Sequence, residues 1–173
     1  MKEKIIWTDA DFAEMGFHDS RLYAISMPGG EDCRFILDID YIFQWDWEKD
    51  KFSKQWVAPC QLIFDYPYNV TINLSFENNV GVDIVDIERT KVKSTTSSNK
   101  WNYKIETDRG DITLDAWGYK LILARQPSDS HDMNIGLHYK ERAFVPLDKT
   151  RNPLLPMPPN RVSVFPDNRR SDP

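Results

Sequence analysis

The sequence predicts a mainly β protein: an antiparallel sandwich or partly closed barrel of about eight strands with one short N-terminal helix. Three observations predict this fold. Apolar and polar side chains alternate with period two over most of residues 20–139, turn-type residues separate the alternating segments, and helical spacing occurs in only one short segment. Alternation of this kind buries one face of a strand and leaves the other in solvent, as in antiparallel sheets.

Composition sets the class of protein before any motif is considered. The chain has 173 residues, of which 40% are hydrophobic, and this is enough apolar material for a packed core. Its formal net charge of -5 argues against non-specific binding to nucleic acid or to an anionic membrane surface. No apolar run approaches the length of a signal peptide or a spanning helix. We therefore expect a cytoplasmic protein with Cys33 and Cys60 reduced, as small core residues.

The predicted helix lies near the N-terminus. Thr8 is suited to cap its first turn, and the acidic Asp9 and Asp11 favour that end of the helix dipole. Phe12 shares a helical face with a methionine three residues later, and Gly16 is a natural stop. The helix is therefore about two turns long and depends on packing against the sheet.

The stretch from residue 33 to residue 47 has the most regular alternation in the chain. Its length exceeds an ordinary strand, so we expect a bend, a bulge or an early end near Gln44. The predicted buried side consists of Cys33, Phe35, Leu37, Ile39, Tyr41, Phe43, Trp45 and Trp47. The predicted solvent side consists of Arg34, Ile36, Asp38, Asp40, Ile42, Gln44, Asp46 and Glu48.

The remaining segments read as hairpins followed by a tail. We expect residues 1–150 to form a single β-rich domain and the Pro-rich residues 151–173 to be extended or partly disordered, since Pro sustains neither helix nor sheet ladders. Between them the sequence predicts a polar loop at 48–55, a strand at 56–65 interrupted by Pro59, strands at 70–76 and 80–88, a flexible loop at 90–100, and further strands beginning at 101, 112, 121 and 135.

His18 and Asp19 form the first candidate site. A histidine oriented by a carboxylate can act as a base or hold a metal ion. The same pair also suits a turn between the helix and the first long strand. The other histidines, His131 and His138, stand at no recognised ligand spacing from His18, so the sequence favours the turn.

Asp38 and Asp40 form the second candidate. They stand two residues apart on one predicted strand, so their carboxylates project from the same side about 7 Å apart. Such a pair could bind a divalent cation or perform acid–base chemistry. The spacing is equally typical of a solvated sheet face, which also carries Gln44, and we favour that interpretation.

Exposed aromatic residues form the third candidate. Trp117 is out of phase with Leu114 and Ala116, which predicts that its ring is exposed, where it could stack on a sugar beside a carboxylate. Three other tryptophans, Trp45, Trp47 and Trp101, fall on faces assigned to the core. No phosphate-binding, dinucleotide-binding, nucleophile-elbow or paired-cysteine motif occurs, so we predict no catalytic residue, no metal ligand and no cofactor.

One part of the chain resembles a known group of proteins. Trp7, the run Phe17-His18-Asp19-Ser20 and the later stretch WVAPCQLIFDY resemble a group of small bacterial proteins of unknown function. Some members look like the immunity proteins encoded beside polymorphic toxins. The resemblance covers residues 7–125 and implies a mostly β, cytoplasmic, non-enzymatic domain with a toxin-like protein partner.

Three functional hypotheses follow. The first is a non-enzymatic interaction module, with the solvent side of the long strand as its contact surface; an acidic balance suits a partner with a basic surface. The second is a carbohydrate or small-ligand binder that uses Trp117. The third is a metal-assisted enzyme around His18, Asp19 and the strand aspartates. A flat acidic face would favour the first, a concave site floored by tryptophan the second, and converging carboxylates the third. The sequence does not specify the oligomeric state.

Overall fold

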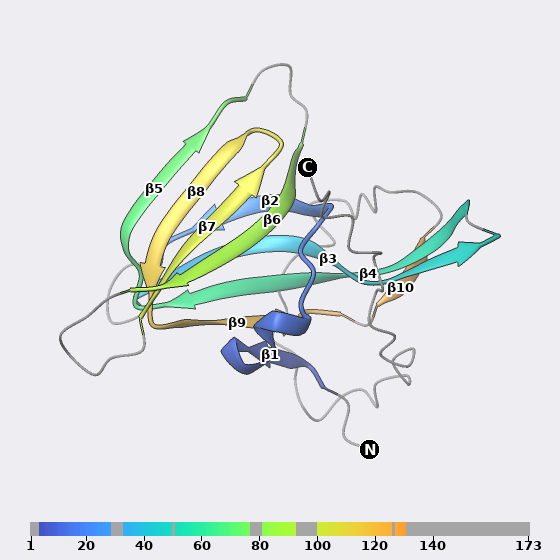
Figure 1. Ribbon diagram of the computed structural model, residues 1–173, viewed down its shortest axis with the longest axis horizontal. Coiled ribbons are helices and arrows are strands. Elements are labelled where there is room, and N and C mark those ends of the chain that lie inside the picture. Colours follow the sequence, from blue (N-terminus) through green and yellow to red (C-terminus); the bar gives the residue numbers. More distant parts are fainter. Residues whose placement is uncertain are drawn as a thin grey trace, which may run out of the picture.

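The computed structural model describes residues 4–28, 33–49, 51–76, 81–92, 100–125 and 127–130. These residues form one antiparallel sheet with a short N-terminal 3-10 helix, so the predicted mainly β class is confirmed (Figure 1). Nine strands follow one another in the order β1-β9-β4-β3-β2-β6-β7-β8-β5, and β10 pairs with β4 beside this path. The elements are β1 (Ile6–Thr8), η1 (Asp9–Glu14), β2 (Ser20–Ser26), β3 (Arg34–Glu48), β4 (Lys51–Asp65), β5 (Tyr68–Leu74), β6 (Val82–Lys91), β7 (Trp101–Thr107), β8 (Gly110–Ala116), β9 (Gly118–Leu123) and β10 (Ser128–Ser130).

The sheet curls over its own buried face without closing. Phe64 of β4 and Tyr103 of β7 lie with their ring centroids 4.9 Å apart, although three strands separate β4 from β7 in the sheet. Figure 1 shows the half of the sheet from β6 to β5 rising over β3 and β4. The two ends of the path, β1 and β5, do not pair with each other. The core lies within this curl and is built by the alternating side chains of facing strands.

Alternation places the buried side of β3 largely as predicted, with two corrections, whereas Asp40 and Ile42 of the predicted solvent side are also buried. Phe35, Leu37 and Ile39 are fully buried. Cys33, however, is exposed just before the strand, whereas Cys60 is buried, and neither forms a disulfide. Trp47 is 57% exposed because the paired ends of β3 and β4 extend as an arm away from the rest of the sheet (Figure 1). Periodicity shows which residues share a face, but it does not show where the covering strands end.

The same arm corrects the predicted loop at residues 48–55. The chain turns at Lys49, which has a φ of 47°, and β4 begins at Lys51. The polar residues that suggested a loop pair across the hairpin with opposite charges, Asp46 with Lys54 and Glu48 with Lys51. The bulge expected near Gln44 is confirmed, since the register shifts between Ile42 and Gln44.

Pro59 lies inside β4 without breaking it. Its carbonyl oxygen accepts a hydrogen bond from the backbone N–H of Ala124 at 2.9 Å, so this peptide faces away from β3. On that side, β9 pairs from Cys60 onward and β10 pairs up to Val57. The missing N–H of Pro59 points to the same side, at the end of the β9 pairing, so it does not interrupt the ladder between β3 and β4.

The N-terminal helix begins where the sequence predicts, as 3-10 turns over Asp9–Glu14. The Asp11 carboxylate accepts a hydrogen bond from the backbone N–H of Thr8 at 2.8 Å and pairs with Lys4. Lys4 and the Thr8 N–H both stabilise the ionised carboxyl, which lowers the pKa of Asp11. Several predicted features lie outside the described residues. They are the middle of the flexible loop at residues 93–99, the strand expected from residue 135, the domain boundary at residue 150 and the Pro-rich tail at residues 151–173.

Candidate functional site

His18 and Asp19 form the turn that leads from η1 into β2, as the sequence favours. Asp19 has a φ of 61°, and its backbone N–H donates to the carbonyl of Ile84 at 2.9 Å. The two ring nitrogens of His18 lie 3.0 Å from the carbonyl oxygen of Val85 and 3.3 Å from the Asp19 carboxylate. The pair therefore holds the start of β2 against β6.

The predicted acidic face on β3 is wrong at Asp40. This residue is 4% exposed, and its carboxylate accepts a hydrogen bond from the Tyr23 hydroxyl at 2.9 Å. Tyr23 of the neighbouring β2 contacts this position, which alternation assigns to solvent. Asp38 is partly buried between Ala24 and Gln61 on the neighbouring strands. The two aspartates therefore do not form an open acidic surface.

Gln44 is also engaged within the sheet. Its amide donates to the carboxylate of Asp46, whose second oxygen accepts the indole N–H of Trp56 at 3.2 Å. Within the described part of the chain, no three histidine, cysteine, aspartate or glutamate side chains come together as a metal site. The six sequence candidates thus fall into three groups, the His18–Asp19 turn, the β3 residues and Trp117, and only Trp117 leads to a larger cluster.

Trp117 is 53% exposed, as its phase predicts, and forms a cluster that we call the aromatic corner: Tyr66, Tyr68, Lys100 and Trp117. The corner lies where β4 turns into β5 and β8 turns into β9. The rings of Tyr66 and Trp117 are 5.9 Å apart and tilted by 54°. The ammonium group of Lys100 stands 5.1 Å from the Tyr68 ring and 5.8 Å from the Trp117 ring.

The backbone of the aromatic corner is held in an uncommon conformation. Tyr66 has a φ of 51° and Asn69 a φ of 52°. Asn tolerates this left-handed region, but a tyrosine there costs about 1–2 kcal/mol. Two hydrogen bonds fix the conformation, from the Tyr66 N–H to the Cys33 carbonyl at 2.9 Å and from the Trp117 N–H to the Asp65 carbonyl at 3.1 Å. The fold thus keeps the Tyr66 ring 62% exposed at a cost in backbone strain.

A buried carboxylate lies beneath the corner. Asp115, opposite Tyr68 in the β5–β8 ladder, is buried. One of its oxygens accepts the side-chain amide of Asn69 and the other that of Asn102, both at 2.7 Å. These bonds pin the bulge at Asn69 to β7 and β8, and they occupy both oxygens of the carboxylate.

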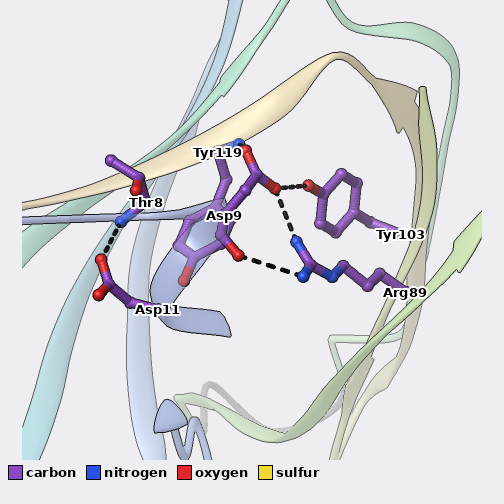
Figure 2. Close-up of polar contacts among 6 residues, drawn as sticks. All are labelled: Thr8, Asp9, Asp11, Arg89, Tyr103 and Tyr119. Atoms are coloured by element: carbon purple, nitrogen blue, oxygen red, sulfur yellow. Dashed lines mark hydrogen bonds and ion pairs between the residues drawn. The ribbon is translucent and has the colours of Figure 1, made fainter. Parts of the chain in front are cut away.

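A second polar cluster, which the sequence analysis missed, surrounds Asp9 (Figure 2). One carboxylate oxygen of Asp9 accepts from Arg89 at 2.7 Å and from the Tyr103 hydroxyl at 2.9 Å. The other accepts the backbone N–H of Tyr119 at 3.1 Å. The four residues come from η1, β6, β7 and β9. Because they are far apart in the sequence, no local motif indicates that they come together.

The polar groups of the Asp9 cluster are used in contacts within the fold. The guanidinium of Arg89 is stacked between the rings of Phe12 and Trp101, at 4.2 and 4.1 Å from their centroids. Burial, followed by the charge of Asp9, raises the pKa of Tyr103 and of Tyr119, so both hydroxyls stay neutral. With both carboxylate oxygens of Asp9 occupied and both faces of the guanidinium covered, the cluster anchors η1 to the sheet.

The comparisons with known proteins assign no family. The chain matches no protein-family model, no curated protein and no solved structure. In the described segments, no helix has the length and apolar character needed to cross a bilayer.

Proposed function

We propose that this protein is a non-enzymatic binding domain that contacts a protein partner through the aromatic corner. The observation that carries the proposal is the positive φ of Tyr66 beside the exposed Trp117. Strained backbone persists where the surrounding structure enforces it, and such positions cluster at binding sites. Trp and Tyr are also the residues that dominate binding energy at protein interfaces.

The geometry favours a protein over a carbohydrate. Tyr66 and Trp117 are tilted by 54° and do not form a flat stacking platform. The Asp115 carboxylate, which could bind sugar hydroxyls, is already occupied by Asn69 and Asn102. Lys100 stands over two of the rings. Two tilted rings with a neighbouring cation instead suit an apolar pocket with an acidic rim on a partner protein.

We propose a toxin as this partner because the sequence of residues 7–125 resembles a group of small bacterial proteins of unknown function, some of which look like immunity proteins. The contact surface that we propose differs from the acidic face expected from the sequence, because Asp40 is buried and Asp38 and Gln44 lie within the sheet. The proposed contact therefore depends on aromatic side chains and much less on the net charge of -5.

Two matched tryptophan variants of the full chain test the proposal. A toxin encoded beside this gene would be produced in an inactive form and titrated calorimetrically with the wild type, Trp117→Ala and Trp47→Ala. Trp47 is the control, since it is 57% exposed on the arm, far from the corner in sequence. We expect Trp117→Ala to weaken the affinity by about thirtyfold or more, and Trp47→Ala to leave it within about threefold.

Two results would overturn the proposal. One is equal affinity of the wild type and Trp117→Ala for the partner. The other is retardation of the wild type, but not of Trp117→Ala, in polysaccharide-containing gels without any measurable protein partner, which would establish carbohydrate binding instead. Circular dichroism and thermal unfolding of each variant show that it is folded.

A further inference from the structure

The strand β5 forms an open edge of the sheet. It pairs with β8 on one side, and no strand among the described residues pairs with its other side. Natural edge strands are usually protected by lysine, proline or a bulge that interrupts pairing. From Tyr68 to Phe76 this edge reads YNVTINLSF, with no charged residue and no proline, in a chain in which 28% of residues are charged. The bulge at Asn69 interrupts its first part and leaves the stretch from Thr71 to Leu74 regular.

The unpaired backbone groups of this edge point outward at regular positions. The backbone N–H of Ser75 donates to the carbonyl of Arg109 on the β8 side at 2.9 Å. Because this direction alternates along a strand, Asn73 and Thr71 also face β8, whereas Leu74 and Ile72 face away from it. The regular ladder spans Thr71 to Leu74, after the bulge at Asn69.

The apolar face of β5 is also incompletely covered. Val70 and Leu74 are partly buried and pack against the core from the end of the curled sheet. Ile72 lies between them on the same face of the strand, yet it is 43% exposed. The core therefore ends at β5 with an aliphatic row that one further strand would cover.

The order of side-chain classes along residues 68–76 is the same when read in either direction from Ile72. An antiparallel copy centred on Ile72 sets Ile72 opposite itself, with like residue classes opposite each other on either side. Aliphatic residues meet aliphatic and polar meet polar in the pairs Val70 with Leu74 and Thr71 with Asn73. The sequence continues this symmetry outside the regular ladder, with Asn69 and Ser75 and with Tyr68 and Phe76.

We propose that β5 is a dimerisation edge, and that a second copy of this chain adds its own β5 antiparallel about a two-fold axis at Ile72. A two-fold interface needs one surface that is complementary to itself, and this edge has that property in both its backbone and its side chains. Two chains of net charge -5 repel each other over most of their surface, and an uncharged edge is where they can approach. The contact is short, so the dimer is weak, with a Kd of roughly micromolar order.

In the proposed dimer Ile72 of one copy lies opposite Ile72 of the other, and substitutions at this position in the full chain test the proposal. Sedimentation velocity would be measured on the wild type, Ile72→Lys, Ile72→Glu and an equal mixture of the two variants. Like charges directly opposite each other destabilise a strand pair, whereas opposite charges stabilise it. We expect the wild type to dimerise, each variant alone to associate at least about tenfold more weakly, and the mixture to regain the dimer.

Val85→Lys is the matched control. Val85 is an exposed aliphatic residue on β6, at 39% exposure, and lies inside the sheet order and away from β5. This variant should dimerise as the wild type does. A wild type that stays monomeric up to about 1 mM, a dimer that survives in both single variants, or a mixture that stays monomeric while circular dichroism shows folded chains would each overturn the proposal.

Discussion

The carboxylate of Asp9 and the guanidinium of Arg89 lie 2.7 Å apart, across a sequence separation of 80 residues. A second nitrogen of Arg89 donates to the backbone carbonyl of Asp9 at 3.2 Å. The arginine thus binds both the side chain and the backbone at the first residue of η1, while Phe12 and Trp101 cover its two faces. A six-residue 3-10 helix has little stability of its own, so this contact determines where it lies on the sheet.

Replacing Arg89 by lysine tests this anchor. Lysine keeps the charge but loses the planar fork and most of the stacking, so Arg89→Lys should lower the free energy of unfolding by about 1–3 kcal/mol. The range allows for the partial exposure of Asp9, which screens the ion pair. Urea unfolding measures the change. Lys120→Ala, which breaks the exposed pair with Asp65, is the control and should cost less than about 1 kcal/mol. Equal losses in the two variants would contradict the anchor.

A glycine packed against the same carboxylate gives a second test. A Cβ added at Gly118 would lie 2.1 Å from Oδ2 of Asp9, so Gly118→Ala must displace that side chain. We expect a loss of about 1–3 kcal/mol in the wild-type background. In an Asp9→Ala background the obstructing carboxylate is absent, and the same change should cost at least about 1 kcal/mol less. Additive losses across this double-mutant cycle would show that Gly118 is required for some other reason.

The sequence predicts those parts of the fold that are expressed as local periodicity. The buried row on β3, the bulge near Gln44 and the exposure of Trp117 all follow from which side chains share a face. Prediction of burial from the sequence fails where the exposure of a residue depends on other strands. Asp40 is buried beside Tyr23 of β2, and Trp47 is exposed near the turn that joins β3 to β4.

The sites show the same limit more strongly. Of the residues in the aromatic corner, the sequence predicts only the exposure of Trp117, because this residue is out of phase with the apolar alternation of its strand. Tyr66 joins it through the turn between β4 and β5, and Lys100 joins it from the position just before β7. Asp9 was read as a residue of the first helical turn, and its three partners are brought to it only by the strand order.

The buried tyrosines predict instability at alkaline pH. Burial raises the pKa of Tyr41, Tyr103 and Tyr119 above the ordinary value of 10.0, so each binds its proton more tightly in the folded state. The stabilisation is complete below pH 10 and is lost as the pH rises above that value, because only the unfolded chain releases these protons. Ultraviolet absorbance of tyrosinate should therefore rise together with unfolding measured by circular dichroism. Titration of all tyrosines before unfolding begins would contradict this.

The backbone strain at Tyr66 predicts that a substitution there can weaken binding of the partner without lowering the stability of the fold. Glycine adopts a φ of 51° without the Cβ penalty, so Tyr66→Gly relieves about 1–2 kcal/mol of strain and offsets the lost contact with Trp117. We expect the free energy of unfolding to stay within about 1 kcal/mol of the wild type, while affinity for the protein partner falls about tenfold or more. Ile72→Gly, in the same edge region but with ordinary strand backbone, gains no such relief and should be less stable than Tyr66→Gly. A Tyr66→Gly variant that binds the partner normally would show that the strained backbone does not serve this contact.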